Sequence, residues 1–135
     1  MTVYDCFMFN NELDLLELRL TILDDVVDRF VLVEAGQSHT GLAKPLHFHD
    51  NIERFARWRG RIDHVALPNL PPDNDAWAND STQRNAIGRG LPDVADDDLV
   101  IVSDIDEIPR RESIEAILAD PSIRIAGLRM PLFYL

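Results

Sequence analysis

The sequence has a single cysteine, Cys6, which lies within a short apolar stretch near the N-terminus. One thiol cannot form a disulfide within the chain. Without a second cysteine there is also no thiolate pair of the kind that binds structural zinc. We therefore expect Cys6 to be a small buried hydrophobic residue.

Basic residues are also scarce. The chain of 135 residues has 13 Lys and Arg against 24 Asp and Glu, so its formal net charge is −11. Such a chain repels the phosphate backbone, and nucleic acid is not expected as a partner. An acidic protein that handles phosphates usually needs a bound cation to reverse the local field. The charge balance therefore favours a cation-dependent site.

Long hydrophobic runs are absent. No stretch approaches the roughly 20 apolar residues that span a bilayer, and the N-terminus lacks the basic and apolar regions of a signal peptide. We predict that the chain as written is cytoplasmic with no membrane segment; its oligomeric state is not indicated. Its length fits one domain, residues 1–135. Because residues 123–135 are apolar, whereas domains commonly end in polar residues, we expect the sequence to stop part-way through that domain.

Short apolar runs alternate with segments of helical periodicity. Strands are expected over residues 3–9, 30–33, 61–67, 99–102, 123–128 and 130–135. Helices are expected over residues 12–23, with Asn11 as N-cap, and over residues 50–58, 77–91 and 109–119. The continuous apolar run at 99–102 predicts a strand buried on both faces. The alternation as a whole predicts an α/β fold with a mainly parallel central sheet.

Polar residues follow three of the expected strands at their carboxyl ends, where α/β sheets bind ligands. These polar segments are residues 10–12, 34–40 and 104–107. We expect them to converge on one site.

The strongest chemical signal is the pair Asp104 and Asp106, which follows the apolar run 99–102. Residues two apart on an extended backbone point to the same side, so the pair is predicted to present two carboxylates to one Mn²⁺ or Mg²⁺ ion. Such hard ions often complete their shell with substrate phosphates and help a diphosphate to leave. The other Asp-x-Asp triplets, at residues 73–75 and 96–98, lie in polar, turn-like surroundings and are interpreted as solvated.

Longer stretches show a family resemblance. The segments YDCFMFNNELDLLELRL, LDDVVDRFVLVEAGQSHTG, KPLHF and DLVIVSDIDEIP resemble glycosyltransferase family 17, in the same order along nearly the whole chain. The resemblance implies a GT-A-like fold for nucleotide-diphospho-sugar transfer, with a Rossmann-like sheet and flanking helices, incomplete at the C-terminus. It also implies metal-dependent, inverting transfer of N-acetylglucosamine from a UDP-GlcNAc donor to a hydroxyl group of a glycan acceptor.

The resemblance implies roles for residues near the acidic pair. Asp104 and Asp106 look like the metal-binding motif, with Asp106 as the first choice for direct ligand and Asp104 also facing the donor. Glu107 is expected to support the site or to cap the helix at Pro109. Arg84 resembles the arginine on the helix before the acidic strand, which holds the acidic pair or the diphosphate. The alternative for Arg84 is an exposed helical arginine.

Other donor contacts are implied at the first two strands. Glu34 resembles an acidic residue that contacts uridine, and the alternative is a strand-end carboxylate that caps local amides. Asn11 and Glu12 occupy the loop that normally meets the nucleotide, unless they only cap the next helix. Lys44, the sole lysine, either neutralises a phosphate or lies on the surface.

The catalytic base is unknown, because such a base usually follows the metal motif and the chain ends 29 residues after Asp106. We expect it beyond residue 135. Two alternative functions stay open. One is a haloacid-dehalogenase-like phosphatase, which also places Asp-x-Asp after an apolar strand and uses the first aspartate as nucleophile. The other is a non-catalytic nucleotide-sugar-binding fragment.

Overall fold

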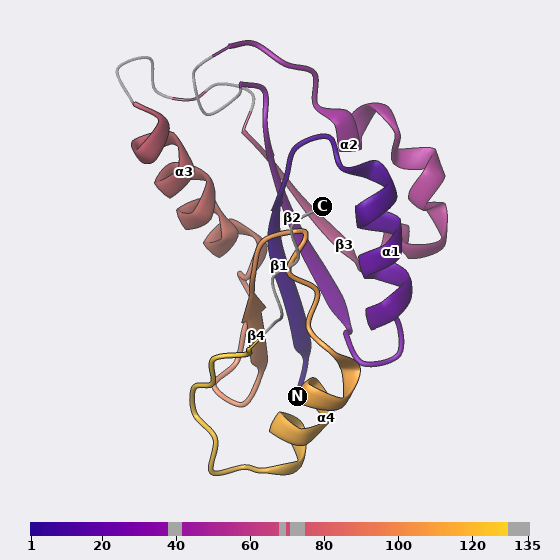
Figure 1. Ribbon diagram of the computed structural model, residues 1–135, viewed down its shortest axis with the longest axis vertical. Helices are drawn as coiled ribbons and strands as arrows, with labels where there is room; N and C mark the ends of the chain where they lie inside the picture. Colours follow the sequence, from indigo (N-terminus) through magenta and orange to yellow (C-terminus); the bar gives the residue numbers. More distant parts are fainter. Residues whose placement is uncertain (38–41, 68–69, 71–74, 130–135) are drawn as a thin grey trace.

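The computed structural model describes residues 1–37, 42–67, 70 and 75–129. Its centre is a sheet of parallel strands in the order β3-β2-β1-β4 (Figure 1). The strands are β1 (Val3–Phe9), β2 (Arg29–Ala35), β3 (Ile62–Leu67) and β4 (Leu99–Val102). The predicted α/β fold with a parallel sheet is confirmed, and the bounds predicted for these strands agree to within two residues.

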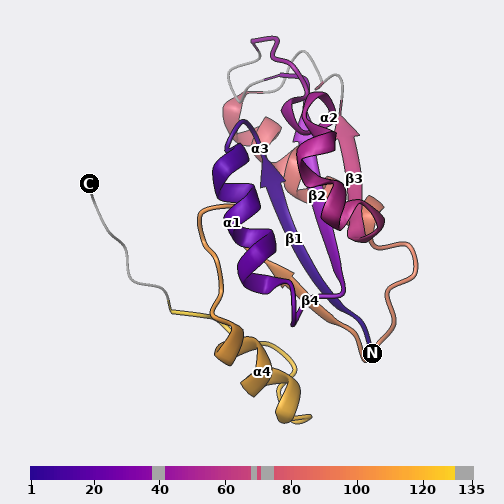
Figure 2. The same cartoon turned by 90° about the vertical axis from the view of Figure 1, so that its right-hand side faces the viewer.

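Helices cover both faces of the sheet, as Figure 2 shows for α1 in front and α3 behind. One face packs against α1 (Leu13–Leu23), α2 (His47–Asp50), the 3-10 helix η1 (Ile52–Arg61) and α4 (Arg111–Ala119). The other packs against the 3-10 helix η2 (Ala86–Gly90), which continues α3 (Ala76–Asn85). The sheet therefore lies between two helical layers.

The alternation of side chains along β1 produces a separate hydrophobic core on each face. Phe7 and Phe9 share a core with α1 and η1, whereas Tyr4 and Cys6 share the core beside η2. Successive side chains of a strand point to opposite faces, which explains the division. Cys6 is fully buried, as predicted, and burial raises the pKa of its thiol to about 12.

The prediction that β4 is buried on both faces was wrong. β4 ends the strand order, and in the described part of the chain it pairs only with β1. Leu99 and Ile101 pack against the core beside α1, but Val100 and Val102 are 37% and 55% exposed. Burial of this strand depends on which elements cover it, and η2 covers β2 and β3 instead. An apolar run cannot reveal that placement.

Three local predictions also need correction. The segment 123–128 forms no strand, because it has no strand partner among the described residues. The last helix starts at Arg111, after a buried Pro109, and not at Pro109. The helix expected at 50–58 is instead α2 and η1, which meet at Asn51. The strand predicted for residues 130–135 lies outside the described residues.

Among the helices that the structure describes, none has both the length and the apolar character needed to cross a membrane.

Candidate functional site

A pocket of about 350 Å³ lies at the carboxyl edge of the sheet, beside the ends of β1 and β4. Segments far apart in the sequence meet there, namely the end of β1 with its loop, α3, and the acidic segment after β4. Its lining residues are Met8, Phe9, Asn10, Glu12, Leu15, Asp80, Gln83, Arg84, Asp104, Ile105 and Asp106. The first and third of the predicted polar segments therefore converge, as expected for parallel strands that end at one edge.

Asp104 and Asp106 lie on a turn, and not on the extended backbone from which their common direction was predicted. The Glu107 N–H donates to the Asp104 carbonyl over 2.9 Å and closes the turn. Ile105, between the two aspartates, is 5% exposed and packs in the core beside α1. Burial of Ile105 anchors the turn while both flanking carboxylates line the pocket. The pair converges because of this turn.

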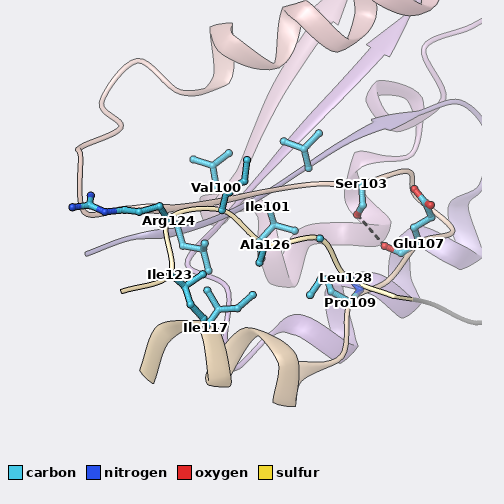
Figure 3. A pocket seen from close by; sticks show the side chains of 14 residues that line it. Val100, Ile101, Ser103, Glu107, Pro109, Ile117, Ile123, Arg124, Ala126 and Leu128 are labelled. Carbon is cyan, nitrogen blue, oxygen red and sulfur yellow. Dashed lines mark hydrogen bonds between the residues drawn. The ribbon is translucent and has the colours of Figure 1, made fainter. Parts of the chain in front are cut away.

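Glu107 stabilises the turn over residues 104–107, called the acidic turn below. Its Oε1 accepts the backbone N–H of Asp104 over 2.9 Å, and its carbonyl accepts a hydrogen bond from the Ser103 hydroxyl over 2.9 Å (Figure 3). The structure thus supports the first of the two expectations for Glu107, support of the site. The other was wrong, because Arg110 occupies the N-cap position of α4 and makes no side-chain hydrogen bond to the helix.

Arg84 connects α3 to the acidic turn. Its Nε donates to Asp80 over 2.9 Å, and its Nη2 donates to Oδ1 of Asp104 over 3.0 Å. Asp80 lies one helical turn before Arg84, so both side chains emerge on the same face of α3. The hydrogen bond that Arg84 donates to Asp80 raises the pKa of Arg84, and the bond that it donates to Asp104 adds to this against the effect of burial. Arg84 therefore ties the first carboxylate of the acidic pair, Asp104, to α3.

The loop after β1 is organised by Glu12. Its Oε1 accepts the backbone N–H groups of Asn10 and Asn11, over 3.0 and 2.7 Å. Glu12 occupies the N-cap position of α1, where Asn11 was predicted, and neither side chain caps that helix. Glu12 lines the pocket, whereas Asn11 is exposed and does not.

Glu34 lies at the end of β2 but is fully buried and outside the pocket. Its carboxylate accepts the backbone N–H groups of Phe48 and His49 over 2.9 and 3.1 Å, and His64 Nε2 lies 2.7 Å from Oε1. Burial raises the pKa of Glu34, but these hydrogen bonds outweigh it and hold the pKa below its usual value. The contacts match the alternative of a carboxylate that caps local amides. Residues 38–40 of the same predicted segment lie outside the described residues.

Lys44 is not a surface lysine. Its Nζ is enclosed and has no hydrogen-bond partner in the described part of the chain. Burial lowers the pKa of this amine, whereas the nearby charges of Glu34 and Glu12 oppose that shift. The amine of Lys44 therefore lies near Glu12, in the loop that borders the pocket.

Sequence reasoning missed Arg19, which is 0% exposed and lies beneath the acidic turn. The signal was present, because Arg19 falls between Leu16, Leu20 and Leu23 on the buried face of α1. A charge on an apolar face requires a buried partner. That partner is Asp5 of β1, which is also 0% exposed.

A larger hollow of about 460 Å³ lies beside β4. It is lined mainly by apolar side chains of β4, α4 and residues 123–128, several of which Figure 3 labels. Only two charged residues, Glu107 and Arg124, line it. The smaller pocket gathers four carboxylates and an arginine, so the polar chemistry lies there.

The carboxylates that line the pocket are oxygen ligands of the kind that a Mg²⁺ or Mn²⁺ ion takes. Among the described residues, no group of three or more His, Cys, Asp or Glu side chains is arranged to bind a metal ion. A Mg²⁺ or Mn²⁺ site needs fewer, since substrate phosphates and waters supply the remaining oxygens. The Asp106 carboxylate is exposed and takes part in no hydrogen bond or ion pair with the residues described.

A parallel sheet with a polar pocket at its carboxyl edge is typical of α/β domains that bind a ligand there. The sequence profile of glycosyltransferase family 17 matches residues 1–124, and the chain belongs to this family.

Three curated relatives share the name Beta-1,4-mannosyl-glycoprotein 4-beta-N-acetylglucosaminyltransferase, from Rattus norvegicus, Homo sapiens and Mus musculus. Each is 32% identical over 120 residues, which cover 83% of this chain. The chain spans 22% of the length of these relatives. No solved structure matches it significantly.

Proposed function

We propose that this chain is the donor-binding part of a metal-dependent, inverting glycosyltransferase with a GT-A-like fold. The reaction would transfer N-acetylglucosamine from UDP-GlcNAc to a hydroxyl group of a glycan. Membership of glycosyltransferase family 17 supports the reaction class, and the name of the relatives supports the sugar. The observation that carries the proposal is that Asp104, Asp106 and Arg84 line one pocket at the carboxyl edge of the sheet.

Asp104 and Asp106 would hold the Mn²⁺ or Mg²⁺ ion, which would neutralise the charge of the departing diphosphate. Asp106 suits direct coordination because its carboxylate is uncommitted. One carboxylate oxygen of Asp104 accepts a hydrogen bond from Arg84, so the orientation of the Asp104 carboxylate is fixed before a ligand binds. The guanidinium of Arg84 also brings positive charge to a pocket otherwise lined by carboxylates, where a diphosphate needs it.

The donor contacts first expected here separate into two groups. Glu12, Arg84 and Asp104 line the pocket and are retained as donor-binding residues. Asn11 and Glu34 do not line it, and the Glu34 carboxylate already accepts hydrogen bonds from two backbone amides. We assign no described residue as the catalytic base.

Membership of the family weighs against the phosphatase alternative. A phosphatase would use Asp104, the first aspartate, as its nucleophile. One oxygen of the Asp104 carboxylate accepts a hydrogen bond from Arg84, whereas the Asp106 carboxylate has no such partner among the described residues. A donor-binding fragment without catalytic activity is the second candidate, and it would bind the donor without transferring the sugar.

Calorimetric titration with UDP-GlcNAc, with and without Mn²⁺, tests the proposal. We expect donor binding to require the ion and to be lost in Asp106→Ala. The matched control is Asp96→Ala, which changes an exposed aspartate of another Asp-x-Asp triplet, outside the pocket, and it should bind as the native chain does. Unchanged donor affinity in Asp106→Ala would refute the assigned site. Hydrolysis of p-nitrophenyl phosphate without release of UDP from the donor would favour the phosphatase.

A further inference from the structure

The buried pair Arg19–Asp5 requires an explanation beyond stability. Both side chains are 0% exposed, and the pair is bidentate, with Nε and Nη2 donating to the two carboxylate oxygens over 2.8 and 2.7 Å. Removing two charges from water is costly, and replacing a buried ion pair with apolar residues of similar size is often neutral or stabilising. Fold stability alone therefore does not account for this pair.

The remaining donors of Arg19 all reach the acidic turn. Its Nη1 lies 2.7 Å from the carbonyl oxygen of Asp104, 3.3 Å from that of Ile105 and 3.2 Å from that of Glu107. Its Nη2 also donates to the hydroxyl of Ser103 over 2.6 Å. Every N–H of the guanidinium thus has an acceptor, and most of the acceptors belong to residues 103–107.

We infer that Arg19 is the positioning residue of the metal site: oriented by Asp5, it fixes the backbone of the turn that presents Asp104 and Asp106. This inference rests on the proposed function. Arg19 binds the carbonyl groups of three of the four successive residues 104–107, so the turn keeps one backbone conformation. The carboxylates of Asp104 and Asp106 therefore keep one placement. Arg19 comes from α1 and Asp5 from β1, so the turn is tied to two rigid elements.

Only a guanidinium suits this place. Its planar fork grips the Asp5 carboxylate on one side and reaches the turn on the other, while its face lies over the Phe7 ring at 4.8 Å. A lysine ammonium is a point charge and could pair with Asp5 without reaching three carbonyl oxygens. Arg19→Lys should therefore keep the buried charge pair and lose the positioning.

The decisive variant is the double replacement Asp5→Leu with Arg19→Met, which removes both charges and keeps apolar volume. The matched control is Asp63→Leu with Arg29→Met. That pair is also bidentate, over 2.7 and 2.6 Å, but joins the amino ends of β2 and β3, away from the turn. Binding of Mn²⁺ is measured from the electron paramagnetic resonance signal of the free ion, and folding from thermal denaturation without metal.

We expect the Asp5/Arg19 double variant to stay folded and to bind Mn²⁺ about 10- to 100-fold more weakly, the usual effect of removing groups that orient metal ligands. Arg19→Lys should weaken binding similarly, and the Asp63/Arg29 control should bind as the native chain does. Amide hydrogen exchange of residues 103–107 should accelerate in both Arg19 variants without any metal, which a general loss of stability would not confine to this turn.

Native Mn²⁺ affinity and native exchange at residues 103–107 in either folded Arg19 variant would overturn the inference. Equal weakening in the control pair would overturn it too, by showing a general effect of charge removal. Failure of the proposed function looks different, since the native chain itself would then bind no Mn²⁺, or Asp106→Ala would bind it normally. In that case exchange at the turn still decides whether Arg19 positions it.

Discussion

Replacing Arg84 by methionine removes the guanidinium that joins α3 to the acidic turn and keeps most of the side-chain volume. Its effect on folding should be small. The Arg84 side chain is 44% exposed, and its partners Asp104 and Asp80 are 47% and 27% exposed. Solvent-exposed ion pairs contribute roughly 0.2–1 kcal/mol, so the free energy of unfolding should change by about 1 kcal/mol or less.

The effect of the same change on donor binding should be larger. Either the guanidinium contacts the diphosphate, or it keeps Asp104 oriented towards the ion, and both are lost in Arg84→Met. A charge-assisted hydrogen bond is worth about 1.5–3 kcal/mol. Since about 1.4 kcal/mol corresponds to a factor of ten, the Kd for UDP-GlcNAc in Mn²⁺ should rise about 10- to 100-fold.

Calorimetry measures this Kd, and urea denaturation of the same samples measures stability. Arg89→Met is the matched control, because Arg89 is an exposed arginine of η2 and does not line the pocket. It removes the same charge from the chain as a whole. The reasoning would be refuted by an unchanged Kd in Arg84→Met, or by equal weakening in Arg89→Met, which would indicate net charge alone.

Two further predictions concern the carboxyl edge and the core that supports it. Glu34→Gln should lower the free energy of unfolding by about 1–3 kcal/mol, because an amide cannot accept every bond that His64, Phe48 and His49 now make to Glu34. Because folding lowers the pKa of Glu34, the stability that its carboxylate contributes is fully present above the pKa of the unfolded chain and is lost as pH falls through the pKa of the folded chain. Urea denaturation should therefore show the difference in unfolding free energy between the native chain and Glu34→Gln becoming smaller in acid. A difference that stays constant with pH would contradict this. Gly90→Ala should cost about 1–3 kcal/mol, since a Cβ there would lie 2.3 Å from Cγ1 of Val31. Val31→Ala in the same chain should relieve part of that loss, and strictly additive losses would show that the clash is not the cause.

The parts of the fold that local pattern determines could be predicted. Alternation and apolar runs located β1, β3 and β4 almost to the residue, because each strand places apolar side chains on the face that it buries. The same patterns could not show that β4 ends the strand order of the described residues, or that residues 123–128 have no strand partner among them. Both depend on contacts between distant segments, which spacing along the chain does not encode.

The candidate site divides in the same way. Asp104 and Asp106 were predicted as site residues because they directly follow an apolar strand, and both line the pocket. Their common direction was predicted from an extended backbone, whereas it results from a turn anchored by Ile105. Glu34 could not be placed from its position after β2, since its contacts come from the α2 segment, which follows it by more than ten residues.

Two arginines hold the acidic turn, one through a side chain and the other through the backbone. Together they explain how an acidic chain can maintain a cluster of carboxylates. Arg84 holds the turn through the side chain of Asp104, while Arg19 holds it through the backbone carbonyls and is itself neutralised by Asp5. Neither arginine contacts the Asp106 carboxylate. The arrangement therefore stabilises the turn without neutralising the Asp106 carboxylate, which stays available for the proposed cation because the restraint is placed on its neighbours.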